Sequence, residues 1–195
     1  MTRAICNHCE RPIITCICCY FTQTANKVNI IVLQHPSEVK QTKGSVALLK
    51  HSLSNCTVFV GEDFTGHQQL QTLIKLYADD LALLYPSEDA EELTGSNYVL
   101  GRSNKPLSTL IVLDGTWKKA YKLFQLNPFL HQLTHVKLAN NVESLYAVRK
   151  TNKVGGLSTL EACCHALACL EGDDNKYQKL LKNFVEFNEM QLAFR

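Results

Sequence analysis

The residues Asp114-Gly115-Thr116-Trp117 lie where an apolar run ends and a helical pattern begins. The run from Leu110 to Leu113 predicts a buried strand, and apolar residues recur at helical spacing after Trp117. An acid, a hydroxyl and the chain's only tryptophan at the carboxyl end of a strand could hold a charged ligand, because the N–H groups that begin a helix are unpaired. The structural alternative is that Asp114 only caps the helix and Trp117 anchors the core.

The cysteines near the start of the chain indicate a second kind of chemistry, metal binding. Cys6, Cys9, Cys16 and Cys18 supply four thiols in two close pairs, a spacing that can form a tetrahedral cage around Zn²⁺. Four protein ligands leave no open position for a substrate, so such a site would be structural. His8 or Cys19 could replace one ligand, and four free thiols are the alternative to a metal site.

The remaining cysteines and two polar residues have simpler interpretations. Apolar patterns surround four thiols, which we expect to be buried: Cys56, Cys163, Cys164 and Cys169. His35 follows a predicted strand and could act as a base, although a lone histidine is more often structural. Glu38 could pair with a cationic group of a ligand or be a solvated surface acid.

The segment from Gly156 to Ala162 has the pattern of a capped helix start. Ser158 can accept a hydrogen bond from the backbone of Glu161, whose side chain can reach back to Ser158, which is a capping box. The glycines and the positive helix end would also allow a carboxylate or a phosphate to approach. The structural and functional interpretations are compatible.

The elements that must position these residues alternate between strands and helices. Strands are predicted at 28–33, 57–60, 81–85, 109–113, 135–138 and 144–148, and helices at 44–53, 67–77, 118–127, 158–170 and 175–192. A short helix and an exposed loop are expected within 87–107. This order predicts an α/β fold with a mainly parallel sheet, helices on both faces and ligands at the carboxyl ends of the strands.

Composition narrows the class of protein. A chain of 195 residues with 46% hydrophobic content fits one domain, with residues 1–23 as a small cysteine-rich appendage to a body at 24–195. No apolar run is long enough to span a membrane and the start lacks a signal-peptide pattern, so we expect a cytoplasmic protein without a membrane partner. Glycine-rich nucleotide-binding loops and nucleophile elbows are absent, which disfavours the cofactors and the covalent catalysis that use them.

A formal net charge of +2 gives no general case for nucleic-acid binding, so any such contact must come from a local patch. The basic residues beside the informative motifs are candidates for phosphate contact, with a solvated surface as the alternative: Lys118, Lys119, Lys122, Arg149 and Lys150.

Seven motifs, taken in order, resemble the DTW-domain family of tRNA-uridine aminocarboxypropyltransferases. They cover about residues 3 to 170 and comprise the four cysteines, Leu33 to Glu38 with Lys43-Gly44, Leu84 to Pro86, Leu113 to Ala120, Asn127-Pro128, Tyr146 to Lys150 and Leu157 to Ala162. The family is similar to the SPOUT-type transferases that use S-adenosylmethionine. The resemblance therefore implies a SPOUT-like catalytic domain at 24–195 with a C-terminal trefoil knot, which periodicity cannot suggest.

The resemblance also implies a reaction, the transfer of the 3-amino-3-carboxypropyl group of S-adenosylmethionine to N3 of a tRNA uridine. Asp114 is the candidate base, with Trp117 beside it. The residues that would bind the donor are Tyr85, Pro86, Asp114, Thr116, Leu138, Ser158, Thr159 and Glu161, with Glu38 as a second candidate for the donor's ammonium group. A SPOUT-like RNA methyltransferase and a non-enzymatic, zinc-containing RNA-binding module are the alternatives. The oligomeric state is left open, with a monomer favoured.

Overall fold

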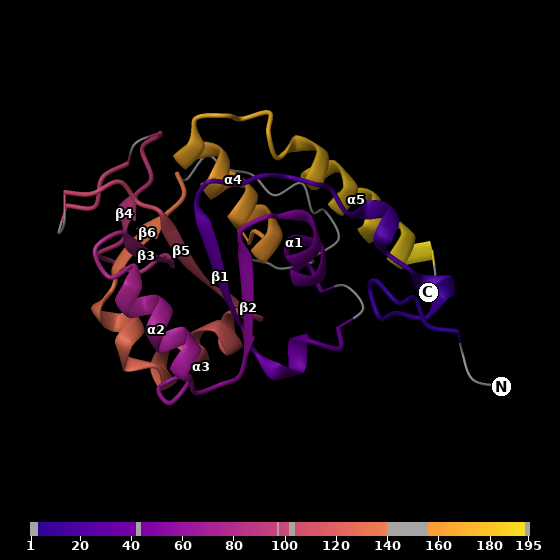
Figure 1. Cartoon of the computed structure of the whole chain (residues 1–195), viewed down its shortest axis with the longest axis horizontal. Coiled ribbons are helices and arrows are strands. Elements are labelled where there is room, and N and C mark those ends of the chain that lie inside the picture. Colours follow the sequence, from indigo (N-terminus) through magenta and orange to yellow (C-terminus); the bar gives the residue numbers. More distant parts are fainter. Residues whose placement is uncertain (1–3, 42–43, 97, 102–103, 140–155, 194–195) are drawn as a thin grey trace.

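A six-stranded sheet forms the centre of the computed structural model, which describes residues 4–41, 44–96, 98–101, 104–139 and 156–193 (Figure 1). The strand order is β2-β1-β5-β3-β6-β4, and every neighbouring pair is parallel. The strands are β1 (Asn29–Gln34), β2 (Cys56–Val60), β3 (Leu81–Leu84), β4 (Glu91–Glu92), β5 (Thr109–Asp114) and β6 (Thr134–Lys137). The predicted parallel sheet is confirmed.

Helices cover both faces of the sheet (Figure 1). They are α1 (Val46–Ser52), α2 (Gln68–Leu76), α3 (Trp117–Leu126), α4 (Thr159–Glu171) and α5 (Gln178–Ala193). In β1, Ile30 and Val32 pack with α1, α4 and α5, whereas Ile31 and Leu33 pack with α2 and α3. Alternate side chains of a strand point to opposite faces, so the unbroken apolar run reflects burial on both sides.

The central strands β1 and β5 meet where the chain changes direction across the sheet. The connection through α1 leads from β1 to β2 on one side, and the connection through α3 leads from β5 past β3 to β6 on the other. Ligands of open parallel sheets bind at such a switch point, outside the carboxyl ends of the strands. Gln34 and Asp114, the last residues of β1 and β5, are register partners at this position.

The segment between Ser87 and Leu107 differs from the prediction. It forms the edge strand β4, paired with β6, and no helix occurs in its described part. The backbone N–H of Leu93 donates to the carbonyl of Lys137 at 2.9 Å, and Leu93 is buried, so edge pairing prevails over the local helical preference of the acids. The predicted strand at 144–148 lies outside the described residues, and the knot stays a prediction.

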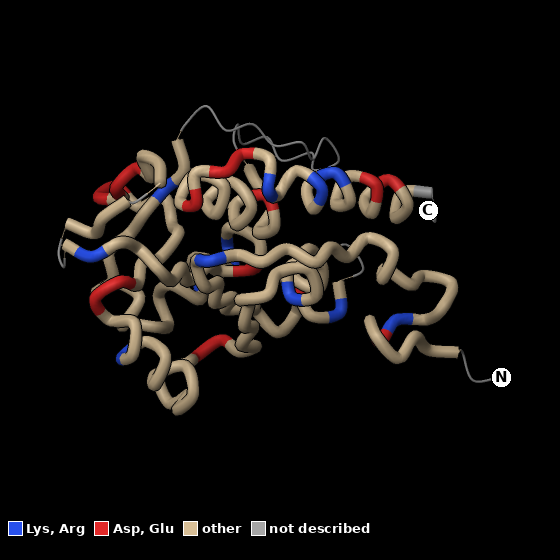
Figure 2. Tube along the Cα trace, turned by 45° about the horizontal axis from the view of Figure 1, so that its top comes forward, with Lys and Arg blue, Asp and Glu red and all other residues tan. Residues whose placement is uncertain are grey.

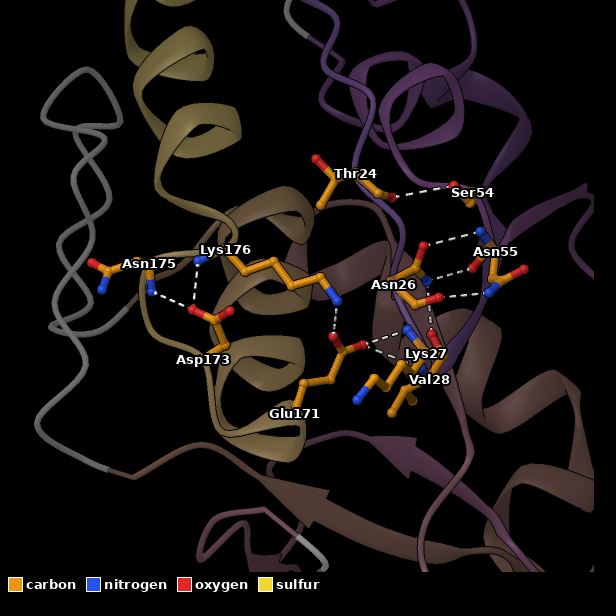
Figure 3. Close-up of polar contacts among 10 residues, drawn as sticks. All are labelled: Thr24, Asn26, Lys27, Val28, Ser54, Asn55, Glu171, Asp173, Asn175 and Lys176. Atoms are coloured by element: carbon orange, nitrogen blue, oxygen red, sulfur yellow. Dashed lines mark hydrogen bonds and ion pairs between the residues drawn. The ribbon is translucent and has the colours of Figure 1, made fainter.

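A buried carboxylate joins the end of α4 to the start of β1 (Figure 3). One oxygen of Glu171 accepts the backbone N–H groups of Lys27 at 2.6 Å and Val28 at 3.2 Å, and the other is paired with Lys176. Gly172 ends α4 with a φ of +64°, a conformation that strains other residues. Side-chain burial raises the pKa of Glu171, but Lys176 and the two N–H donors outweigh it and lower the pKa overall.

We expect Glu171→Gln to lower stability at neutral pH by about 2 kcal/mol, because a charged acceptor of several hydrogen bonds is lost. A pKa lowered by folding stabilises the protein above the ordinary glutamate pKa, and that stabilisation is lost as the pH falls through the folded value. In denaturant titrations, the free energy of unfolding of the variant should therefore fall less steeply than that of wild type between about pH 5 and 3. Glu88→Gln, at an exposed residue, is the control; equal pH slopes in wild type and Glu171→Gln would contradict the prediction.

Candidate functional site

Asp114 links three elements at the carboxyl edge of the sheet. Its Oδ2 accepts a hydrogen bond from Nε2 of Gln34 at 2.9 Å, and its Oδ1 accepts one from the hydroxyl of Thr159 at 2.6 Å. Gln34 ends β1, Asp114 ends β5, and Thr159 is the first residue of α4. Asp114 is 7% exposed, so its carboxylate is held in a fixed position at the switch point of the sheet.

The start of α4 is fixed by the predicted capping box. The Ser158 hydroxyl accepts from the N–H of Glu161 at 3.2 Å, and a Glu161 oxygen accepts from the N–H of Ser158 at 2.8 Å. Both residues are buried. The box orients the first turn of α4, and Thr159 in that turn contacts Asp114. The capping prediction is confirmed, and the helix start lies beside the candidate acid.

The start of α3 corrects two sequence interpretations. Thr116, not Asp114, caps the helix, since its hydroxyl accepts from the N–H of Lys119 at 3.4 Å. The cap leaves the Asp114 side chain available for Gln34 and Thr159. Trp117 is 47% exposed, so the structural alternative of a core anchor is wrong. The tryptophan instead offers an aromatic surface at the first turn of α3.

Gly115 makes the turn between β5 and α3 compact. A Cβ atom at this position would lie 2.9 Å from the Cβ of Lys119, which is closer than real Cβ contacts come. Glycine therefore permits the close approach of the strand end to the first turn of the helix.

Two linked ion pairs that the sequence did not predict lie at the same edge of the sheet. Nε2 of His35 lies 2.8 Å from Glu62, and the other Glu62 oxygen lies 2.5 Å from Nζ of Lys122. Nδ1 of His35 contacts Ser37 at 2.9 Å. The hydrogen bond from Lys122 is the largest cause that lowers the pKa of Glu62, with His35 adding to it. Both ring nitrogens of His35 are engaged, which favours its structural interpretation.

The signal for Glu62 was present in the sequence. It follows Val60 and Gly61 at the end of a predicted strand, which is the position that singled out Asp114. The position after a strand therefore marks Glu62 as well as Asp114.

The lysines of α3 differ in their partners. Lys119 pairs with Glu38 at 2.6 Å and Lys122 with Glu62, whereas Lys118 is exposed and forms no ion pair with a described residue. Glu38 thus has a lysine partner. Figure 2 shows basic and acidic positions interspersed along the trace, in keeping with the small net charge. Arg149 and Lys150 lie outside the described residues.

The other predicted ligand residues follow β3 and β6. Tyr85 stacks on Phe124 of α3, with ring centroids 4.7 Å apart and planes inclined by 10°. Burial raises the pKa of Tyr85, and the nearby Tyr121 hydroxyl adds to that rise. Pro86 is exposed. Leu138 lines a cavity of about 290 Å³ with residues of α4 and α5, among them His165.

Four thiols near the start of the chain converge as predicted. Cys6, Cys9, Cys16 and Cys18 place their sulfur atoms within 4.8 Å of one another. The Sγ atom of Cys6 lies 3.6 Å from the Sγ atom of Cys16 and 3.6 Å from that of Cys18. The Sγ atoms of Cys9 and Cys16 are 3.7 Å apart. A tetrahedral zinc site with Zn–S bonds of about 2.3 Å requires sulfur separations of about 3.8 Å. The donor set and its spacing fit Zn²⁺.

The alternative ligands are placed elsewhere. Cys19 is exposed and outside the group, and the ring of His8 lies against Phe21 and His51. Backbone N–H groups of Cys9 and His8 lower the pKa of Cys6 to about 6, while burial and the neighbouring thiols raise that of Cys18. A cation would let all four ionise together.

The remaining cysteines are packed in the protein. Cys163 and Cys164 are buried, as predicted, and Cys56 and Cys169 are half-buried against the core. Burial raises the pKa of Cys163 well above its usual range. These thiols are therefore poor nucleophiles.

Among the described residues, no helix is both long and apolar enough to cross a membrane.

A family model described as the DTW domain matches residues 3–192. The chain is 32% identical over 192 residues to tRNA-uridine aminocarboxypropyltransferase 2 of Drosophila melanogaster, an overlap of 96% of this chain and 74% of the fly protein. It is 29% identical to the Mus musculus protein of that name, over 97% of this chain and 64% of the mouse protein. The chain is 27% identical to tRNA-uridine aminocarboxypropyltransferase A of Arabidopsis thaliana, over 97% of this chain and 83% of the plant protein. No solved structure matches.

Proposed function

The chain belongs to the DTW-domain family, and we propose on this basis that it modifies tRNA by transferring an aminocarboxypropyl group from S-adenosylmethionine to a uridine. The observation that carries the proposal is the similarity, over 96–97% of this chain, to relatives named for this activity in an insect, a mammal and a plant. A tRNA substrate fits the cytoplasmic location that the sequence predicts.

Asp114 is the proposed base. Uridine N3 must lose its proton as it attacks the carbon beside the sulfonium; the new N–C bond forms while the C–S bond breaks and methylthioadenosine leaves with the electron pair. Asp114 would take the proton. Its support is geometric: the carboxylate is fixed by Gln34 and Thr159 at the edge where open parallel sheets bind ligands.

The donor's amino-acid end is proposed to lie at the start of α4. Ser158, Thr159 and nearby N–H groups would hold its carboxylate, because a helix start favours an anion. Glu161 or Glu38 would face the ammonium group, although each already has a partner. Of the two, Glu161 is the better candidate because it belongs to the same helix turn as Ser158 and Thr159.

The remaining donor contacts are proposed around β3, α3 and β6. Thr116 and Trp117 would shape the pocket beside Asp114, and Tyr85, Pro86 and Leu138 would contact the nucleoside. Lys118, Lys119, Lys122, Arg149 and Lys150 would contact tRNA phosphates, with Lys118 the readiest because it has no ion pair among the described residues.

A structural Zn²⁺ is proposed in the group of Cys6, Cys9, Cys16 and Cys18, supported by the sulfur spacing. When bound, the ion would hold the segment 1–23 in shape against the catalytic domain at 24–195. The SPOUT-like relationship and the knot remain part of this proposal.

Two labels on the donor separate the possible functions. We expect carboxyl-labelled S-adenosylmethionine to label tRNA, and methyl-labelled donor to leave it unlabelled while the label appears in methylthioadenosine. Methyl label on tRNA would instead indicate a methyltransferase. No label from either donor, with tRNA binding retained, would indicate a non-enzymatic RNA-binding module.

A further inference from the structure

The exposed side of α3 combines aromatic rings with positive charge. Trp117 and Tyr121 are 47% and 58% exposed and lie one helical turn apart, so their side chains share one side of the helix. Lys118 and Lys122 alternate with them, and the ten residues of α3 contain three lysines and no acid. The first of these rings directly follows the turn that carries Asp114.

A cluster of packed rings lies next to Tyr121 along α3. Phe124 of the same helix stacks on Tyr85 and lies 4.2 Å from the ring of His131, measured between centroids. Nδ1 of His135 contacts Ser87 at 2.7 Å, and its ring lies 5.5 Å from that of Phe124. Tyr121 lies three residues before Phe124, on the same side of α3, so this cluster borders the exposed rings.

From this combination we propose that Tyr121, with Trp117, is a stacking surface for unpaired RNA bases next to the target uridine. The inference rests on the proposed function. N3 of uridine carries the proton of a Watson–Crick pair, so a uridine that reacts at N3 must be unpaired, and its neighbours in a loop then expose their faces. Aromatic rings beside lysines are the usual surface for such nucleotides, because the rings stack on bases and the lysines contact phosphates.

Charge argues against a second copy of this chain as the occupant. A twofold contact would bring Lys118, which has no ion pair among the described residues, near Lys118 of the second copy, which is unfavourable. A polyanion with exposed base faces complements both the charge and the rings.

Binding of two fluorescein-labelled RNAs tests the proposal: an unmodified tRNA transcript, and a blunt duplex with the same number of phosphates. Tyr121→Ala should weaken transcript binding about tenfold and leave duplex binding unchanged, because only the transcript offers unpaired bases. Tyr121→Phe should bind almost as wild type, since the ring is retained. Lys118→Ala should weaken both and reduce the salt slope by about one. Leu126→Ala, at an exposed apolar residue of α3, is the matched control and should change neither.

Unchanged transcript binding in Tyr121→Ala would overturn the proposal, and so would an equal loss for both RNAs. Sedimentation gives a third way to overturn it: a wild-type dimer that Tyr121→Ala converts to a monomer would assign the surface to self-association. Carboxyl-label transfer by the wild type judges the proposed function separately. If wild type transfers the label and Tyr121→Ala has an unchanged KM for tRNA, only the stacking surface fails. If wild type transfers none but the binding pattern is found, only the activity fails.

Discussion

Replacing Asp114 by Asn is expected to lower kcat for aminocarboxypropyl transfer by about 100- to 10,000-fold, the range that removal of a general base produces. The fold should persist because the substitution preserves shape. The oxygen of the new amide can accept from Thr159 as Oδ1 does now, and Gln34 can turn its amide to present an oxygen to the new N–H₂ group. The KM for S-adenosylmethionine should change little, since the loss concerns proton removal.

Single-turnover transfer of carboxyl label to tRNA measures this effect, and thermal unfolding followed by circular dichroism checks the fold. Asp89→Asn is the matched control, since Asp89 is exposed and lies in the connection between β3 and β4. Full activity in Asp114→Asn would remove Asp114 as the base. A melting temperature well below that of wild type would instead show that the carboxylate chiefly ties β1, β5 and α4 together.

The sheet and its helices were predictable because burial on both faces leaves a strong pattern. Strands such as β1 read as unbroken apolar runs, and the turns that begin α3 and α4 have polar residues with known capping chemistry. The segment that contains β4 could not be predicted in this way, because an edge strand of two acidic residues is specified by its partner β6 and not by its own periodicity.

The site was predictable where one local motif carries the chemistry. The four thiols and the capping box each lie within a short stretch of chain, and the structure brings the predicted members of each together. Contacts between segments that are distant in the sequence could not be predicted. His35, Glu62 and Lys122 come from three distant segments of the chain, and the pairing of Glu62 depends on the order of strands in the sheet, which motifs alone do not give.

The position at which α3 begins could not be predicted to the residue. Asp114 and Thr116 are both good N-cap residues, two positions apart, so the sequence alone does not decide which one begins the helix. Parallel pairing with β1 extends β5 through Asp114, and the helix start therefore moves to Thr116. Tertiary pairing thereby directs the carboxylate of Asp114 to Gln34 and Thr159.

Metal removal should have a large effect on stability, because the cysteine group fixes a core residue. Ile17 lies between two of the four thiols and is fully buried in the main hydrophobic cluster. The same segment docks through Tyr20, whose carbonyl accepts from Asn183 of α5 at 3.0 Å and whose ring meets Phe187 at 5.9 Å. Without a metal, the four thiols would no longer be bound to a common centre, and these packing contacts would have to hold the segment in place.

We expect one zinc ion per chain, and its loss in Cys16→Ser or after prolonged chelation. Freeing Ile17 from the core would cost about 3 kcal/mol, comparable with a large-to-small core substitution, and a chain of this size would then melt about 10 °C lower. Metal analysis and thermal unfolding measure the two effects. Cys19→Ser is the matched control: Cys19 is the next residue but one after Ile17 and lies outside the group, so that variant should keep both zinc and melting temperature. Equal zinc content in Cys16→Ser and Cys19→Ser would contradict the assigned ligand set, and a Cys16→Ser protein that loses zinc without melting earlier would show that the packing of Ile17 does not depend on the metal.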